Sequence, residues 1–149
     1  MMDLRPVGYV VGLLVAVLGL FMLLPMLVDL AEGRGHAIVF VETFLITTLG
    51  GGMIALACSN GVREGLTLQQ TFLLTTGVWL ALPVFGALPF VLGATDSVIV
   101  DAFFEAMSAL TTTGATALDG LDTLPKGLLL WRGIMQWLGG IGIIVVAMV

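Results

Sequence analysis

Residues 103–116 read Phe-Phe-Glu-Ala-Met-Ser-Ala-Leu-Thr-Thr-Thr-Gly-Ala-Thr, an apolar helical segment that runs directly into three threonines and a glycine. The segment from residue 97 to residue 110 has about fourteen residues, which at ~1.5 Å per residue cover roughly 20 Å of the ~30 Å of bilayer hydrocarbon. Such a segment enters the membrane and turns back. Non-helical backbone at that depth is tolerated only inside protein or beside water, where a dehydrated cation can bind the carbonyls that lack donors. The stretch therefore predicts a re-entrant half-helix that ends in a cation filter.

The composition of the 149-residue chain is that of a membrane protein, with 59% hydrophobic residues, 10% charged residues and a mean hydropathy of +1.16. A soluble domain carries about 25% charged residues. The net charge of -5 argues against nucleic acid as a partner, because phosphate binding needs clustered lysines and arginines. One histidine and one cysteine provide no Ser/His, Cys/His or metal-ligand constellation. We therefore expect no enzyme activity and no cofactor beyond a transported ion.

Four long apolar stretches predict helices that cross the membrane. They cover residues 7–28, 37–58, 68–92 and 127–149. The first follows a single basic residue, Arg5, and no small-residue cleavage site comes after it, so we interpret it as an anchor that stays. Pro25 should kink or end this helix, and Ser97 is a possible N-cap of the half-helix. The last stretch is still apolar at Val149, which suggests a truncated or split chain.

Glycines mark places where helices can approach each other. Gly50, Gly51 and Gly52 lie in the middle of the second span and would let another helix pack closely. Gly8 and Gly12 form a Gly-xxx-Gly pair, which is either a dimer face or a chance pair in a glycine-rich segment, and we favour chance. The glycines at positions 139, 140 and 142 either pack helices together or form a flexible point in the last span.

The predicted order of elements is helix, helix, and then helix, half-helix with filter, helix. This order describes an all-α polytopic membrane protein with one re-entrant pore helix and filter loop. Residues 1–65 form two leading transmembrane helices, and residues 66–149 form one span, pore, span unit. The chain contains no second copy of the filter sequence, so it holds one repeat unit, and one unit supplies one wall of a pore.

Several motifs of this unit resemble the first pore repeat of the TrkH/KtrB family of potassium uptake proteins, which includes the Trk, Ktr and HKT branches. The motifs are the run 101–116, Ala87-Leu88-Pro89-Phe90, Leu124-Pro125-Lys126, Trp131-Arg132, and the run 136–145. The resemblance implies four such units in one longer polypeptide, a cytoplasmic nucleotide-binding regulatory subunit and a homodimer in the inner membrane of the cell. This chain departs from the family by carrying the first quarter of that pore alone.

The resemblance also assigns the filter residues. It implies that Thr112 and Thr113 donate K⁺-binding carbonyls, that Gly114 and Ala115 complete the strand, and that a glycine at position 114 goes with potassium preference. The residues themselves favour a cation at this place, because carbonyl dipoles and the negative end of the helix dipole converge there. Gly114 adopts positive φ cheaply, which a filter strand requires. The alternative is a plain polar loop that caps a buried helix.

Glu105 and Arg132 are charged residues within apolar segments, where burying either side chain alone would cost free energy. Glu105 lies inside the half-helix, and Arg132 lies between one and two turns into the last span. A buried ion pair would offset both costs and clamp the pore helix against the following span. The alternative is that each side chain reaches water separately.

The predicted function is transport of potassium through a pore of which this chain forms one quarter, as a symporter or a channel in the lipid bilayer. The alternative is a non-conducting fragment or a structural membrane subunit of the same fold.

The positive-inside rule does not decide the orientation of the chain, because two basic residues would lie on each side of the membrane. Arg5 and Arg63 would lie on one side, and Arg34 and Lys126 on the other. The acidic residues favour a cytoplasmic N-terminus, because with that orientation most of them would attract cations to the outer pore mouth. They are Asp29, Glu32, Asp96, Asp101, Asp119 and Asp122.

Overall fold

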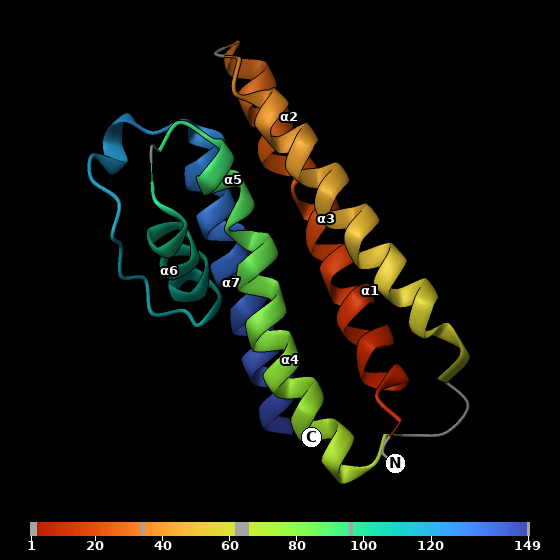
Figure 1. The fold of residues 1–149 in the computed structure, drawn as a ribbon. Helices are drawn as coiled ribbons and strands as arrows, with labels where there is room; N and C mark the ends of the chain where they lie inside the picture. Colours follow the sequence, from red (N-terminus) through yellow and green to blue (C-terminus); the bar gives the residue numbers. More distant parts are fainter. Residues whose placement is uncertain (1–2, 34, 62–65, 96, 149) are drawn as a thin grey trace.

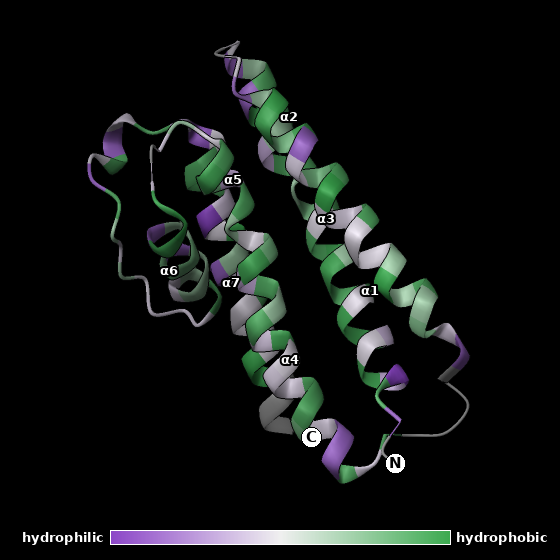
Figure 2. Cartoon of the chain, in the orientation of Figure 1, coloured by the Kyte–Doolittle hydropathy of each residue, from purple (hydrophilic) through white to green (hydrophobic). Residues whose placement is uncertain are grey.

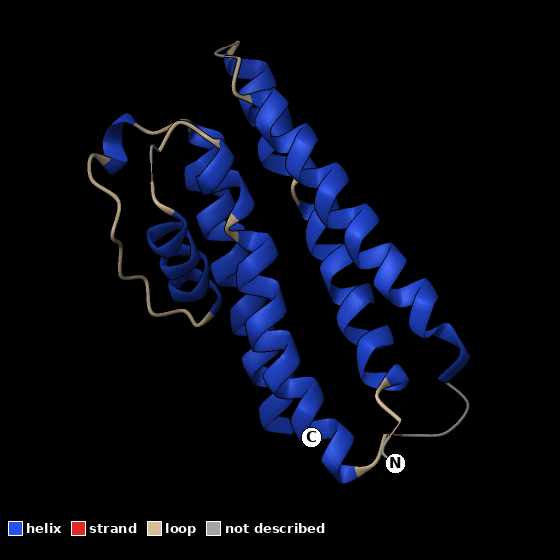
Figure 3. Ribbon diagram, in the orientation of Figure 1, coloured by secondary structure: helices blue, strands red, loops and turns tan. Residues whose placement is uncertain are grey.

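The computed structural model describes residues 3–33, 35–61, 66–95 and 97–148. Within these ranges the chain folds into helices, and no strand occurs, so the prediction of an all-α fold is confirmed (Figure 3). Four residues used in the orientation and chain-end arguments lie outside the described ranges. They are Arg34, Arg63, Asp96 and Val149.

The described residues form seven α-helices and two short 3₁₀ turns. In chain order they are α1 (Arg5–Phe21), α2 (Leu23–Glu32), α3 (Ala37–Cys58), η1 (Ser59–Gly61), α4 (Leu68–Gly86), α5 (Leu88–Leu92), α6 (Ile99–Leu110), η2 (Leu121–Thr123) and α7 (Lys126–Met148). Four stretches among them are long and apolar enough to cross a membrane, which confirms the predicted spans. These are Arg5–Glu32, Ala37–Cys58, Leu68–Leu92 and Lys126–Ile144.

Helices α1 and α2 lie along α3 (Figure 1). Helix α4 packs against α1, and α7 packs against α2. The short α6 lies against α4 and α7, on the side away from α1 and α3. The chain enters α6 from the end where α5 and η2 lie, and the loop after α6 returns to that same end. Both termini lie at the opposite end. The outer faces of the long helices are hydrophobic, as contact with lipid requires (Figure 2).

The first span is broken at Met22, between α1 and α2. Pro25, which is buried inside α2, has no N–H to donate to the carbonyl of Phe21, four residues earlier. The N–H of Met22 instead bonds the Gly19 carbonyl, three residues back. The predicted kink is therefore confirmed, and it lies three residues before the proline that causes it.

Two glycines bring α1 and α3 into backbone contact. A Cβ on Gly12 would lie 2.7 Å from the Gly51 carbonyl oxygen. A Cβ on Gly51 would lie 2.6 Å from the Gly12 carbonyl oxygen. The prediction that the glycines of the second span admit another helix is thus confirmed at Gly51. Gly8 also faces α3, because its Cβ would lie 2.6 Å from Cys58 Sγ. The Gly-xxx-Gly pair thus packs against α3 within the chain, a role that neither interpretation named.

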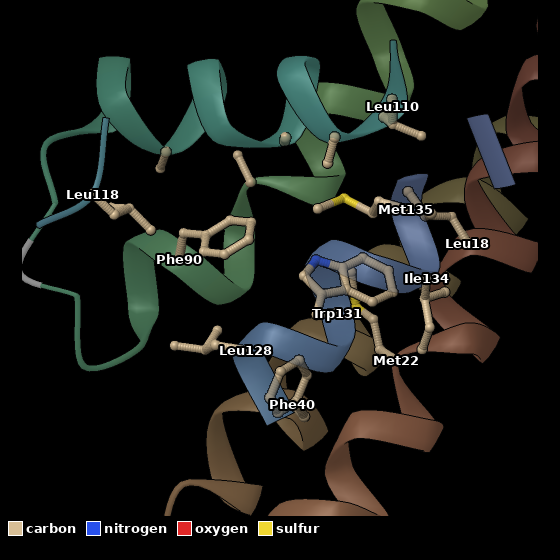
Figure 4. Packing of buried hydrophobic residues seen from close by; sticks show 14 residues of the cluster. Leu18, Met22, Phe40, Phe90, Leu110, Leu118, Leu128, Trp131, Ile134 and Met135 are labelled. Carbon is tan, nitrogen blue, oxygen red and sulfur yellow. The ribbon is translucent and has the colours of Figure 1, made fainter. Parts of the chain in front are cut away.

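The buried core joins the break between α1 and α2 to α3, α5, α6 and α7. Trp131 lies at its centre, with Met22, Phe40, Phe90 and Leu128 around it (Figure 4). These five side chains are at most 2% exposed. The indole Nε1 of Trp131 donates a 2.9 Å hydrogen bond to the carbonyl of Gly86, the last residue of α4. Trp131 therefore fixes α7 against the end of α4.

Helix α6 begins at Ile99, with Val98 as its N-cap residue and no side-chain cap. Ser97 was predicted to cap it, and this prediction is wrong. The Ser97 hydroxyl instead donates to the Phe90 carbonyl at 3.3 Å, because that carbonyl lies at the end of α5, where the helix offers no donor. The 12 residues of α6 extend about 18 Å, which is shorter than the ~30 Å of bilayer hydrocarbon.

Candidate functional site

The loop after α6 is tied to the last turn of the helix through its N–H groups. The backbone nitrogens of Thr113 and Gly114 lie 2.9 and 3.3 Å from the Ser108 carbonyl oxygen, to which both donate. The N–H of Thr112 bonds the Ala109 carbonyl at 3.0 Å. These bonds turn the chain back at the negative end of the helix dipole. The N–H groups of residues 112–114 are thereby bonded to the last turn of α6.

Two residues of this loop have left-handed backbone conformations, Thr112 with φ of 59° and Gly114 with φ of 75°. The positive φ expected for Gly114 is confirmed. Thr112 is the sole non-glycine residue with positive φ in the described chain, and a β-branched residue there is a strained outlier. Such strain costs on the order of 1–3 kcal/mol and concentrates at functional sites.

The carbonyl oxygens of Thr112, Thr113 and Gly114 accept no hydrogen bond from any residue in the described part of the chain. All three residues are exposed, as are Ala115 and Thr116 after them. The carbonyl of Ala115 differs, because it accepts a 2.7 Å hydrogen bond from the Ser108 hydroxyl. The structure thus places the four predicted filter residues in one exposed stretch of loop. Three of its carbonyls are open to a cation, and the fourth already has a donor.

Glu105 holds the residues that follow this stretch of loop. Its side chain is fully buried, at 0% exposure. The Oε1 atom accepts hydrogen bonds from the Thr116 hydroxyl at 2.6 Å, the Ala117 N–H at 2.6 Å and the Leu118 N–H at 3.3 Å. A buried carboxylate that accepts several such bonds orders the loop that donates them.

Arg132 of α7 reaches the other oxygen of the same carboxylate. Its Nε lies 2.9 Å from Glu105 Oε2, and its side chain is 19% exposed. The two atoms are at ion-pair distance without the alignment of a hydrogen bond. The structure therefore brings together the two charges that the sequence singled out, next to the loop that follows α6.

Sequence reasoning missed two residues of the site, Ser108 and Thr116, and left the role of Gly139 open. The first could have been found, because Ser108 lies three residues after Glu105 and so shares its helix face. Gly139 matters because a Cβ there would collide with the Leu110 carbonyl oxygen and lie 2.6 Å from the carbonyl carbon. Of the two interpretations of this glycine, close helix packing is thus the one the structure supports. Gly139 lets α7 touch the end of α6.

The acidic residues at this end of the molecule differ in their burial and their partners. Asp29 is 1% exposed, and its Oδ1 accepts a 2.7 Å hydrogen bond from the Gly127 N–H. Glu32 forms an ion pair with Lys126. Asp119 and Asp122 are exposed. The carboxylates of Asp29 and Glu32 are thus engaged at the start of α7.

Comparison with known proteins gives consistent matches. The model of the family TrkH, described as cation transport protein, matches residues 36–149. The chain is 42% identical over 147 residues to the Trk system potassium uptake protein TrkH of Vibrio parahaemolyticus, and 42% identical over 148 residues to that of Escherichia coli K12. Each alignment covers 98% of this chain and 30% of the relative.

The fold has a solved counterpart. The crystal structure of the potassium transporter TrkH from Vibrio parahaemolyticus matches with a TM-score of 0.92 and 41% sequence identity, over 99% of this chain and 31% of the other. The chain thus spans about a third of the length of the relatives it matches.

Proposed function

The chain belongs to the TrkH family of cation transport proteins, and on that premise we propose that it forms one wall of a potassium-selective pore. Its family is one of membrane transporters rather than enzymes, and the relatives above are named potassium uptake proteins. In this proposal K⁺ binds the backbone carbonyls of Thr112, Thr113 and Gly114, and Ala115 completes the strand. Glu105 and Arg132 form a structural pair that holds the strand in place.

The observation that carries this proposal is the row of three carbonyls without donors after α6. A dehydrated K⁺ ion needs oxygen ligands in place of its hydration shell, and unpaired carbonyls at membrane depth need a cation or water. The strained φ of Thr112 supports the same conclusion, because strain of this kind persists where surrounding contacts impose it. The hydrogen bonds from the N–H groups of Thr112 and Thr113 to the last turn of α6 are contacts of this kind.

One such strand covers one side of an ion, so we propose that further pore repeats complete the ring. Residues 66–149 would be one span, pore, span unit, and residues 1–65 would be a leading helix pair. The resemblance supports a homodimer and a cytoplasmic nucleotide-binding regulatory subunit as further partners, in the inner membrane. No cofactor enters this proposal beyond the transported ion.

Flux measurements test the proposal. The 149-residue chain, verified as a monomer in proteoliposomes, should carry no potassium flux, because one strand leaves the other sides of the ion without ligands. The same chain completed by further repeats should take up potassium in preference to sodium. Selective flux from the monomer would show that the filter lies elsewhere. No flux from the completed pore would favour the alternative, a non-conducting structural subunit.

The proposed orientation places the N-terminus in the cytoplasm, which puts the α7 start and η2 outside. In sealed cells an impermeant thiol reagent should label Asp122→Cys, made in a Cys58→Ser background, because position 122 is exposed. Native Cys58, at the end of α3 near the N-terminus, should react only after the membrane is permeabilised. Labelling of Cys58 from the outer face of intact cells would reverse the assignment.

A further inference from the structure

We propose that Asp29 of α2 is a positioning residue for the filter, an inference that rests on the proposed function. The Oδ1 atom of Asp29 accepts a 2.7 Å hydrogen bond from the N–H of Gly127, in the first turn of α7, across 98 residues of chain. The side chain is 1% exposed. The leading helix pair thus supplies a cap to the last helix of the pore unit.

The start of α7 needs such a cap from elsewhere in the chain. The first N–H groups of a helix lack acceptors within that helix, and a carboxylate there is also favoured by the helix dipole. An Asp, Asn, Ser or Thr just before the helix usually provides the acceptor. Here Leu124 and Pro125 precede α7, and neither side chain carries an oxygen. Asp29 therefore takes the role that the local sequence leaves open.

The fit between the two residues is close. A Cβ on Gly127 would lie 2.5 Å from Asp29 Oδ1, so the carboxylate lies directly against the backbone of α7. The other oxygen, Oδ2, has no hydrogen-bond partner among the described residues. The bond to Gly127 is therefore the polar contact by which this buried side chain holds α7.

The position of α7 along its axis determines two contacts of the pore helix and filter. Arg132 lies five residues after Gly127, about 7.5 Å along the helix, and pairs with Glu105. Glu105 in turn holds residues 116–118 of the filter loop. Farther along, Gly139 lies against the Leu110 carbonyl at the end of α6. An axial shift of α7 would move both contacts, and Asp29 opposes that shift.

The test compares variants of the assembled transporter in proteoliposomes. Asp29→Ala removes the acceptor, and Gly127→Ala displaces it from the opposite side because the new Cβ collides with the carboxylate. Both should lower the ratio of potassium to sodium flux by roughly fivefold or more. Asp29→Asn keeps an oxygen for the Gly127 N–H and should stay close to the unchanged protein. Gly133→Ala is the matched control, because a Cβ at Gly133 meets nothing within 4 Å.

The outcomes separate the two proposals. If the unchanged protein is selective, and both Asp29→Ala and Gly127→Ala keep its ratio of potassium to sodium flux, the role of Asp29 is overturned and the proposed function is left intact. An equal loss in Gly133→Ala would do the same, since that change leaves the cap in place. Failure of both cap variants to accumulate as folded protein would show a general structural role and would also overturn the inference. Absence of flux in the unchanged protein would overturn the proposed function, and this inference with it.

Discussion

Replacing Arg132 by alanine is expected to lower the free energy of unfolding by about 3 kcal/mol, because Glu105 is left as a buried carboxylate without its counter-charge. Glu105 is 0% exposed, and its Oε2 has no other partner among the described residues. The measurement is denaturant unfolding of the detergent-solubilised protein. Lys126→Ala is the matched control. Its ion pair with Glu32 has a 72% exposed lysine, so its loss should cost about 0–1 kcal/mol.

A double-mutant cycle separates the pair from general damage to α7. Glu105→Gln combined with Arg132→Ala should be more stable than the sum of the two single changes predicts, because the neutral amide needs no counter-charge. The glutamine can still accept the bonds from the filter loop through its amide oxygen. A coupling energy of zero within error would remove the ion pair from the account of the site.

Replacing Gly114 by serine in the completed pore is expected to lower the preference for potassium over sodium by about tenfold. The cause is the backbone: Gly114 has φ of 75°, and a residue with a side chain pays roughly 1–2 kcal/mol there, so the strand relaxes to another conformation. Space is not the cause, because a Cβ at Gly114 finds its nearest neighbour, Gln136 Nε2, at 3.8 Å. The measurement is paired potassium and sodium flux in proteoliposomes.

Gly35→Ser provides a control with the same backbone cost. Gly35 has φ of 76°, and a Cβ there meets nothing within 4 Å, but the residue lies between α2 and α3, far from the filter in the chain. This variant should be destabilised to a similar extent and keep its selectivity. Equal selectivity in Gly114→Ser and the unchanged protein would show that the strand at 112–115 is not the filter.

The residues of the filter loop show how far sequence reasoning reaches. The positive φ of Gly114 followed from the residue type, because glycine alone adopts that conformation without strain. The positive φ of Thr112 did not follow, since it opposes the preference of a threonine and depends on the bonds that surround it. Likewise, a buried charge at Glu105 called for a partner. The bonds from Ala117 and Leu118 appear only once the loop is folded.

The sequence by itself determined the four spans, the short α6 and the turn that follows it. These depend on the apolar length of each segment against the thickness of the bilayer and on residue-type preferences, and both are local properties. Only the tertiary structure decided that Gly8 and Gly12 face α3 rather than another chain, and that Asp29 caps α7 across 98 residues. Contacts of this kind depend on which helices become neighbours and on how far each is shifted along the axis of the other. That choice is made by the packing of the whole core, which no segment encodes alone.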